Sequence, residues 1–233
     1  MSGKHSVWYA FVRWVVKHGY FGTHGGIRSI DERNVPQSGP VLVAPIHLSY
    51  LDPPAVACGT RRRLRFMAKE ELFVHAVLGR LIASLGGFPV KRGEADTESI
   101  RKAISIIEDG EALLIFPEGS RGDGESIQEM SRGVAMLAKR TKAPVVPVGV
   151  IGTNLVMPRG KSKGTRHLVT LVYGKPFTFE EVATGSNERQ NRDLFTAELQ
   201  RRIVELCAAN GMPLKTSTSR SDSASSAGLE PKP

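Results

Sequence analysis

The sequence predicts a single α/β domain with a mixed, largely parallel sheet flanked by helices. Five short, almost continuously apolar runs alternate with longer amphipathic segments, and these runs are residues 41–46, 63–68, 112–117, 145–151 and 168–173. Continuous rather than alternating hydrophobicity is typical of strands that helices cover on both faces. The 233 residues suffice for one domain with a sizeable core, but not for two domains of ordinary size.

Three segments have the spacing expected of the covering helices. Residues 70–85 place apolar side chains at steps of three and four. Residues 96–109 open with Asp96 and Thr97 as candidate caps, and Gly110 ends them. Residues 187–209 gather their apolar side chains on one face and end in helix-stopping residues.

Residues 6–20 predict a helix of a different kind. They are rich in Trp, Tyr, Phe and Val, with Arg13, Lys17 and His18 gathered toward the end. Amphipathic aromatics prefer the headgroup boundary of a membrane, while Lys and Arg side chains reach toward water and anionic phosphates. The alternative is a helix packed on the domain, because the same aromatics also bury well, and both can hold together.

We therefore expect an amphipathic membrane-surface helix in residues 1–25, a catalytic domain in residues 26–212 and a disordered tail in residues 213–233. The tail is rich in Ser, Ala and Pro and has no apolar period, so burial cannot offset its ordering entropy. Arg13 and Lys17 interrupt the early apolar stretch, so neither a secretory signal nor a spanning helix is expected there.

The charge balance is basic, with 32 Lys and Arg against 23 Asp and Glu and a net charge of +9. Clusters such as residues 61–65 attract polyanions, either nucleic acid or an anionic membrane, unless they only confer solubility. The aromatics are not interleaved with basic residues, which argues against nucleic acid. Cys58 and Cys207 fit neither a metal site nor a disulfide framework and indicate a reduced, cytosolic compartment.

The segment PIHLSYLDPP, directly after the first strand, carries the clearest candidate for chemistry. Ends of strands are where α/β sheets place ligand sites. His47 and Asp52 are five positions apart, too far for one face of a straight helix, but a turn entering a helix can bring them together. Asp52 would then fix the imidazole tautomer and leave the other nitrogen as a base. An incidental pair in a surface turn is the alternative.

Two further segments combine glycine with charge. Residues 86–93 place Lys91 and Arg92 after a short strand, which suits a phosphate. Residues 115–124 place Glu118 and Arg121 in a turn after a buried strand. There Glu118 could bind a glycerol hydroxyl or hold an arginine, and Arg121 could chelate phosphate, unless the turn is merely solvated. Residues 144–154 predict an apolar strand. Its side chains either line the binding site of an acyl chain or belong to the hydrophobic core.

These blocks, in this order over residues 40–155, resemble the PlsC-type glycerolipid acyltransferases, the family that contains 1-acylglycerol-3-phosphate acyltransferase. The resemblance implies His47 as general base and Asp52 as its partner. It implies Lys69, in RFMAKEELF, as a supporting residue, and it implies no metal and no cofactor. The residues implied to bind the acceptor's phosphate and glycerol are Lys91, Arg92, Glu118, Gly119, Ser120 and Arg121.

The implied reaction is direct transfer of a fatty acyl group from acyl-CoA or acyl-carrier protein to the free hydroxyl of 1-acylglycerol 3-phosphate, which gives phosphatidic acid for phospholipid synthesis. The sequence has no Gly-x-Ser-x-Gly elbow and no cysteine beside His47, so it offers no obvious protein nucleophile. This agrees with direct transfer, without an acyl-enzyme. The alternatives are glycerol 3-phosphate or another lysophospholipid as acceptor, an esterase or thioesterase with the same base, or a non-catalytic lipid-binding protein.

The expected partners are the lysophospholipid acceptor, the acyl thioester donor and an anionic membrane surface, without nucleic acid. The expected location is the cytoplasmic face of the plasma membrane, as a peripheral protein.

Overall fold

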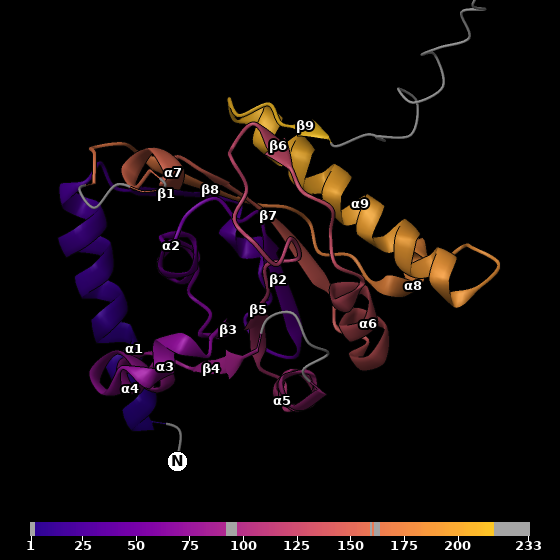
Figure 1. The fold of residues 1–233 in the computed structure, drawn as a ribbon, viewed down its shortest axis with the longest axis horizontal. Coiled ribbons are helices and arrows are strands. Elements are labelled where there is room, and N and C mark those ends of the chain that lie inside the picture. Colours follow the sequence, from indigo (N-terminus) through magenta and orange to yellow (C-terminus); the bar gives the residue numbers. More distant parts are fainter. Residues whose placement is uncertain (1–2, 92–96, 159, 161–163, 217–233) are drawn as a thin grey trace, which may run out of the picture.

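A computed structural model of the chain describes residues 3–91, 97–158, 160 and 164–216. A seven-stranded sheet runs through its centre in the order β1-β8-β7-β2-β5-β3-β4 (Figure 1). Neighbouring strands are parallel except β7 and β8, which are antiparallel. The predicted single domain with a mixed, largely parallel sheet is confirmed. The strands are β1 (Ile27–Ile30), β2 (Val41–Pro45), β3 (Leu64–Lys69), β4 (Gly87–Val90), β5 (Ala112–Leu114), β7 (Val145–Ile151) and β8 (Val169–Tyr173).

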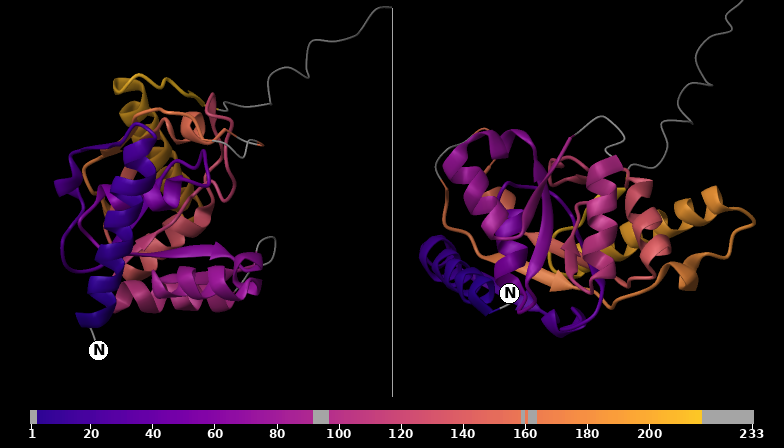
Figure 2. Two further views of the ribbon diagram at one scale, coloured as in Figure 1. Left: turned by 90° about the vertical axis from the view of Figure 1, so that its left-hand side faces the viewer. Right: turned by 90° about the horizontal axis from the view of Figure 1, so that it is seen from below.

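Helices cover both faces of the sheet, which is why its central strands are continuously apolar. Every residue of β2 and β5 is buried. On one face, α2 (Asp52–Gly59) packs on β8, and the Tyr173 hydroxyl donates to the Val56 carbonyl at 3.2 Å. On the other face lies α9 (Glu188–Ala209), the long helix at the C-terminal end of the colour range in Figure 2. Cys207 of α9 packs against Gly149 of β7.

The remaining helices follow the predictions in part. The helix predicted at 96–109 is present as α5 (Thr97–Glu108), while α6 (Arg132–Thr141) was not predicted. The one helix expected at 70–85 is instead two, α3 (Glu71–Val74) and α4 (Ala76–Ser84), because the backbone of His75 is extended. The short elements are a 3₁₀ turn (Glu32–Asn34), α7 (Thr153–Val156), α8 (Phe179–Val182) and the two-stranded pair of β6 (Ser126–Ile127) with β9 (Lys215–Thr216).

The helix α1 (Gly3–Val15), continued by a π-helical turn (Val16–Phe21), packs on the domain and also exposes apolar side chains. Tyr9 is buried, and its hydroxyl accepts a hydrogen bond from the Leu64 N–H at 3.3 Å. The Trp8 indole donates to Ser84 Oγ of α4 at 3.0 Å. Among the helices that the structure describes, none combines the length and the apolar character needed to span a bilayer.

The arginine cluster after α2 is largely engaged within the protein. Arg62 donates to three backbone carbonyl oxygens, and Arg65 forms a salt bridge with Glu111 at 3.3 Å. The Arg63 guanidinium lies 5.7 Å from the centre of the Tyr9 ring. These contacts hold loops and α1 in place, while Arg61 of the same cluster is exposed, so the attraction of this cluster for polyanions stays a prediction.

The C-terminal boundary differs from the expectation. Residues 213–216, assigned from the sequence to the tail, carry the buried side chain of Leu214 and the strand β9, whose Lys215 N–H donates to the Glu125 carbonyl at 2.9 Å. A single apolar residue was too weak a pattern to reveal this short pairing. The rest of the predicted tail, residues 217–233, lies outside the described residues.

Candidate active site

The residues predicted to act together follow the carboxyl ends of neighbouring parallel strands. His47 comes after β2, and residues 115–122 come after β5, its neighbour. Lys69 ends β3 and Lys91 follows β4, the next two strands along the sheet. Because parallel strands end at the same edge, all four segments share one rim. With strands about 4.8 Å apart, β3 and β4 end about 10 and 14 Å from β2.

The imidazole of His47 and the carboxylate of Asp52 are in direct contact, as predicted. His47 Nδ1 lies 2.8 Å from Asp52 Oδ2, across a turn that leads into α2. The same carboxylate oxygen accepts the backbone N–H groups of Leu48 at 2.6 Å and Ser49 at 2.7 Å. The turn therefore folds around Asp52, which solves the problem of their five-residue separation.

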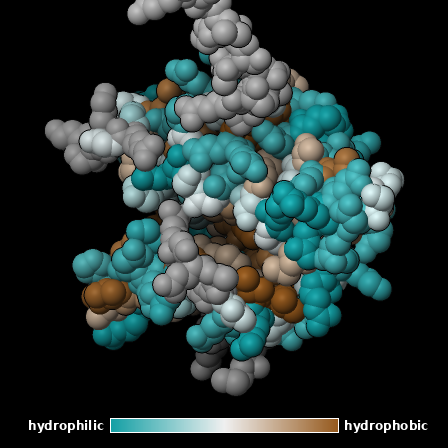
Figure 3. Space-filling view, turned by 45° about the vertical axis from the view of Figure 1, so that its right-hand side comes forward, coloured by the Kyte–Doolittle hydropathy of each residue, from teal (hydrophilic) through white to brown (hydrophobic). Residues whose placement is uncertain are grey.

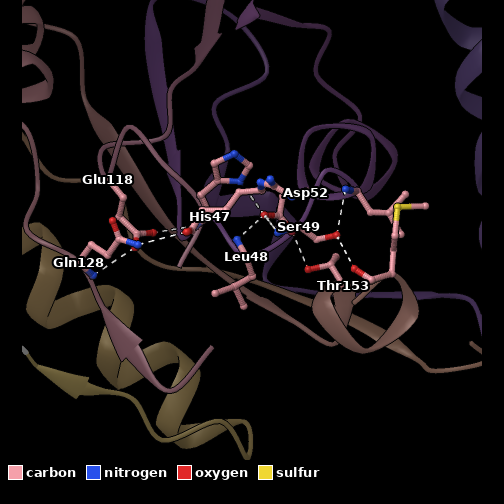
Figure 4. A network of polar contacts seen from close by, with 10 residues as sticks. His47, Leu48, Ser49, Asp52, Glu118, Gln128 and Thr153 are labelled. Carbon is pink, nitrogen blue, oxygen red and sulfur yellow. Dashed lines mark hydrogen bonds and ion pairs between the residues drawn. The ribbon is translucent and has the colours of Figure 1, made fainter. Parts of the chain in front are cut away.

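A fourth donor completes the shell of Asp52. The hydroxyl of Thr153 donates to Asp52 Oδ1 at 2.6 Å, and both residues are fully buried (Figure 4). Buried polar groups are normally satisfied in this way. Sequence reasoning missed Thr153, although a polar Gly-Thr-Asn directly after the strand 145–151 could have indicated it, because β7 is parallel to β2 and ends at the same rim.

The ring and backbone of His47 are fixed by the segment that follows β5. The imidazole stacks on the Phe116 ring with 4.1 Å between centroids, and the His47 side chain is 9% exposed. The His47 N–H donates to Glu118 Oε1 at 2.7 Å, and the Gly122 N–H donates to the His47 carbonyl at 2.7 Å. With Nδ1–H donated to the carboxylate, Nε2 is the ring nitrogen left to take a proton.

Glu118 contacts the backbone of His47 and makes contacts that differ from those expected. Its second oxygen accepts the Gln128 N–H at 3.2 Å, so both carboxylate oxygens hold backbone (Figure 4). Burial raises the pKa of Glu118, against the lowering effect of these N–H groups. Glu118 therefore links the backbone of His47 to the loop that follows β5, through hydrogen bonds to the N–H groups of His47 and Gln128. Its expected contact with glycerol stays a prediction.

Gln128, which the sequence did not single out, ties the same loop together. Its side chain accepts the Ser120 hydroxyl at 2.8 Å and donates to the Arg121 carbonyl at 3.2 Å. Gly119 has a φ of 66°, a conformation that favours glycine in this tight turn. Gln128 thus holds Ser120 and Arg121 in the loop whose Glu118 and Gly122 contact the backbone of His47.

The Arg121 guanidinium lies 3.6 Å from the centre of the Tyr50 ring, within the turn that joins His47 to Asp52. Within the described part of the chain, Arg121 makes no salt bridge with a carboxylate. The structure thus places the Arg121 side chain on the turn that carries His47 and Asp52, and its expected contact with phosphate stays a prediction.

The remaining cations are farther along the rim. Lys69 forms an exposed salt bridge with Glu71 at 2.8 Å. Lys91 is exposed at the end of β4, and Arg92 lies outside the described residues. The binding roles expected of all three stay predictions.

Comparisons with known proteins identify the family of the chain. A family model described as Acyltransferase matches residues 26–151. The chain is 29% identical over 184 residues to a 1-acyl-sn-glycerol-3-phosphate acyltransferase of Bacillus subtilis (strain 168), covering 78% of this chain and 88% of that protein. It is 26% identical over 186 residues to the enzyme of that name from Streptococcus pneumoniae (strain ATCC BAA-255 / R6), covering 78% and 67%.

The fold has a counterpart among solved structures. The crystal structure of the 1-acyl-sn-glycerophosphate (LPA) acyltransferase, PlsC, from Thermotoga maritima superposes with a TM-score of 0.74 at 23% identity, over 92% of this chain and 86% of that one. At this identity the likeness shows the fold alone.

Proposed function

Because this chain belongs to the acyltransferase family and is an enzyme of that class, we propose that it acylates the free hydroxyl of 1-acylglycerol 3-phosphate to give phosphatidic acid. The observation that carries the proposal is the buried contact between His47 and Asp52 at the rim, with the Arg121 guanidinium stacked on Tyr50 of the same turn. The names of the bacterial relatives support this acceptor. The donor is an acyl thioester, of CoA or of acyl-carrier protein.

The chemistry follows from the orientation of the ring. His47 Nε2 takes the proton of the acceptor hydroxyl, and its oxygen attacks the thioester carbonyl carbon as the C–S bond breaks. The imidazolium, stabilised by Asp52, then returns the proton to the departing thiolate. The nearby Ser49 hydroxyl donates to the Met157 carbonyl at 3.3 Å and accepts the Leu51 N–H, which supports transfer without an acyl-enzyme.

Arg121 supplies the positioning in this proposal. A planar guanidinium can bind two phosphate oxygens at once. With the phosphate of the acceptor bound there, the hydroxyl of the same molecule stays within reach of His47. Such positioning can contribute more to the rate enhancement than the base itself. Ser120 and Lys91 are further candidate phosphate contacts.

The test offers the purified protein a labelled acyl thioester, as CoA or carrier-protein ester, with lysophosphatidic acid, glycerol 3-phosphate or lysophosphatidylcholine. Phosphatidic acid identified by mass supports the proposal. Free fatty acid without new lipid would indicate a hydrolase, and a different acylated product would replace the proposed acceptor.

Two substitutions test the assigned roles. His47→Ala should lower kcat by about a hundred- to ten-thousand-fold, while His75→Ala, an exposed histidine on another segment, should not. Arg121→Ala should mainly raise KM for the phosphate-bearing acceptor. Full activity in His47→Ala would refute the general-base assignment.

We further propose that the enzyme works on an anionic membrane surface, on its cytoplasmic face. Free, buried cysteines fit a reducing compartment. Large apolar side chains are exposed on α1 and on the neighbouring pair α3–α4, and they are Val7, Trp8, Phe11, Trp14, Val15, Leu72, Val74, Val77, Leu78 and Leu81. The helical periodicity of 70–85 thus marks an outward face rather than core.

Apolar side chains also lie in a hollow on the face seen in Figure 3, as an acyl chain requires.

The double substitution Trp8→Ser and Trp14→Ser should weaken co-sedimentation with vesicles that contain phosphatidylglycerol. Leu194→Ser serves as the matched control, because Leu194 is an exposed apolar residue on α9, away from this surface. Unchanged binding of the double variant would count against the membrane proposal.

A further inference from the structure

Tyr50 stands in the turn between His47 and Asp52 without a role in the chemistry described so far. The residue is 69% exposed, so it adds little to the core. Within the described part of the chain its hydroxyl makes no hydrogen bond. Its one close polar contact there is with the Arg121 guanidinium, whose central carbon lies 3.6 Å from the centre of the ring. The exposed ring of Tyr50, in the turn between His47 and Asp52, therefore has its contact with Arg121 as its main interaction among the described residues.

That distance fixes the orientation of the two groups. A planar guanidinium can bring its carbon this close only by lying flat on the ring, because an edge-on approach would drive a nitrogen into it. Flat stacking occupies the face of the guanidinium and leaves its N–H donors, which lie in its plane, directed outward. A carboxylate partner would instead compete for those donors.

We propose that Tyr50 is a positioning residue that holds Arg121 ready for the phosphate of the acceptor. The inference rests on the proposed function and deepens it. Gln128 fixes the backbone of Arg121 through its carbonyl oxygen, and Tyr50 fixes the far end of the side chain. Tyr50 is three residues from His47 and two from Asp52, so the stacking ties the phosphate contact to the base within one rigid turn.

The consequence is a selective effect on substrate binding. Tyr50 touches neither the imidazole nor the carboxylate in the structure's contacts. Loss of the ring frees a long arginine side chain to sample many rotamers, and the acceptor must then order it. KM for a phosphate-bearing acceptor should therefore rise while kcat stays nearly unchanged.

The experiment is a double-mutant cycle on the full chain. Tyr50→Ala should raise KM for lysophosphatidic acid about 2- to 30-fold, the range of cation–π contacts from exposed to desolvated sites, with kcat within about twofold. Tyr50→Phe keeps the ring and should match the wild type. In an Arg121→Ala background, Tyr50→Ala should add nothing further.

Three results would overturn the inference: unchanged KM in Tyr50→Ala, an effect equally large without Arg121, or a failure of Tyr50→Phe to restore KM. A fall in kcat at constant KM would also contradict it. Thermal unfolding of each variant controls for folding.

A second measurement separates this inference from the proposed function. If the wild type forms no acylated lipid, the proposed function fails by that observation alone. The stacking is then tested by phenylglyoxal modification of Arg121, followed by mass spectrometry, with glycerol 3-phosphate as protectant. Protection should require several-fold more glycerol 3-phosphate in Tyr50→Ala than in the wild type or Tyr50→Phe. Equal protection in all three, or none in the wild type, would refute the role of Tyr50.

Discussion

The hydroxyl of Thr153 offers the sharpest test of the buried site, because a methyl group of similar size can replace it and nearly keep the shape of the core. Thr153 and Asp52 are both fully buried, and the hydroxyl donates to Asp52 Oδ1 at 2.6 Å. Thr153→Val keeps the volume but leaves a carboxylate oxygen without that donor. A hydrogen bond to a charged group contributes about 1.5–3 kcal/mol. In a chain of this size each kcal/mol shifts Tm by about 2–4 °C, so Tm should fall by about 3–12 °C.

Activity should fall with stability, for a related reason. Asp52 loses one of the contacts that hold it against His47, so the effect belongs to kcat rather than to KM for the acceptor. If the whole 1.5–3 kcal/mol were lost from the transition state, kcat would fall about 10- to 150-fold, which is the ceiling. Calorimetry and steady-state kinetics measure the two effects, with Thr153→Ser, which keeps the hydroxyl, as control. A Thr153→Val enzyme with wild-type Tm and kcat would refute this account of the site.

Three further outcomes follow from contacts elsewhere. A side chain at Gly59 would meet Leu171 Cδ1 at 2.2 Å, so Gly59→Ala should destabilise by about 1–3 kcal/mol in urea unfolding, whereas Gly19→Ala, with nothing within 4 Å, should not. Burial raises the pKa of Glu118 above its ordinary 4.5, so its contribution to stability is greatest below that value and declines as pH rises through the folded pKa; Glu118→Gln should remove this slope from a pH series of unfolding free energies. Hydrogen bonds from the neighbouring arginines lower the pKa of Glu198 from 4.5 to about 2, so its contribution, below about 1 kcal/mol, is present above pH 4.5 and is lost as pH falls toward 2; a Glu198→Gln difference that persists below pH 2 would contradict this.

The predictions that held are those in which the local pattern and the tertiary environment agree. Strands buried on both faces must be continuously apolar, so the runs at 41–46 and 145–151 appear as β2 and β7. The turn around Asp52 is encoded locally as well, because its donors at Leu48 and Ser49 lie within four residues of the carboxylate. Such elements are visible in a single sequence.

The sequence was a poorer guide where a local pattern does not specify which part of the protein, or solvent, lies against the segment. The apolar steps of 70–85 were read as one helix facing the core, but Val77 is 84% exposed and the helix breaks at His75. The arginines at 62, 63 and 65 form a basic cluster in the sequence, and only the structure shows that carbonyl oxygens, a ring and a carboxylate engage them, while the attraction of the cluster for polyanions stays a prediction. Periodicity and charge describe the surface of an element, not its neighbours.

The sequence by itself determined the fold class, the family and the contact between His47 and Asp52, because these depend on local burial patterns, on the order of short motifs along the chain and on a turn of a few residues. Only the tertiary structure placed Thr153 on Asp52, 101 residues away, turned Glu118 toward the backbone of His47, 71 residues away, and laid Arg121 on Tyr50. Those contacts arise where the ends of different parallel strands meet at one rim. The order of strands in a sheet is set by the packing of the whole chain, and no local pattern carries it.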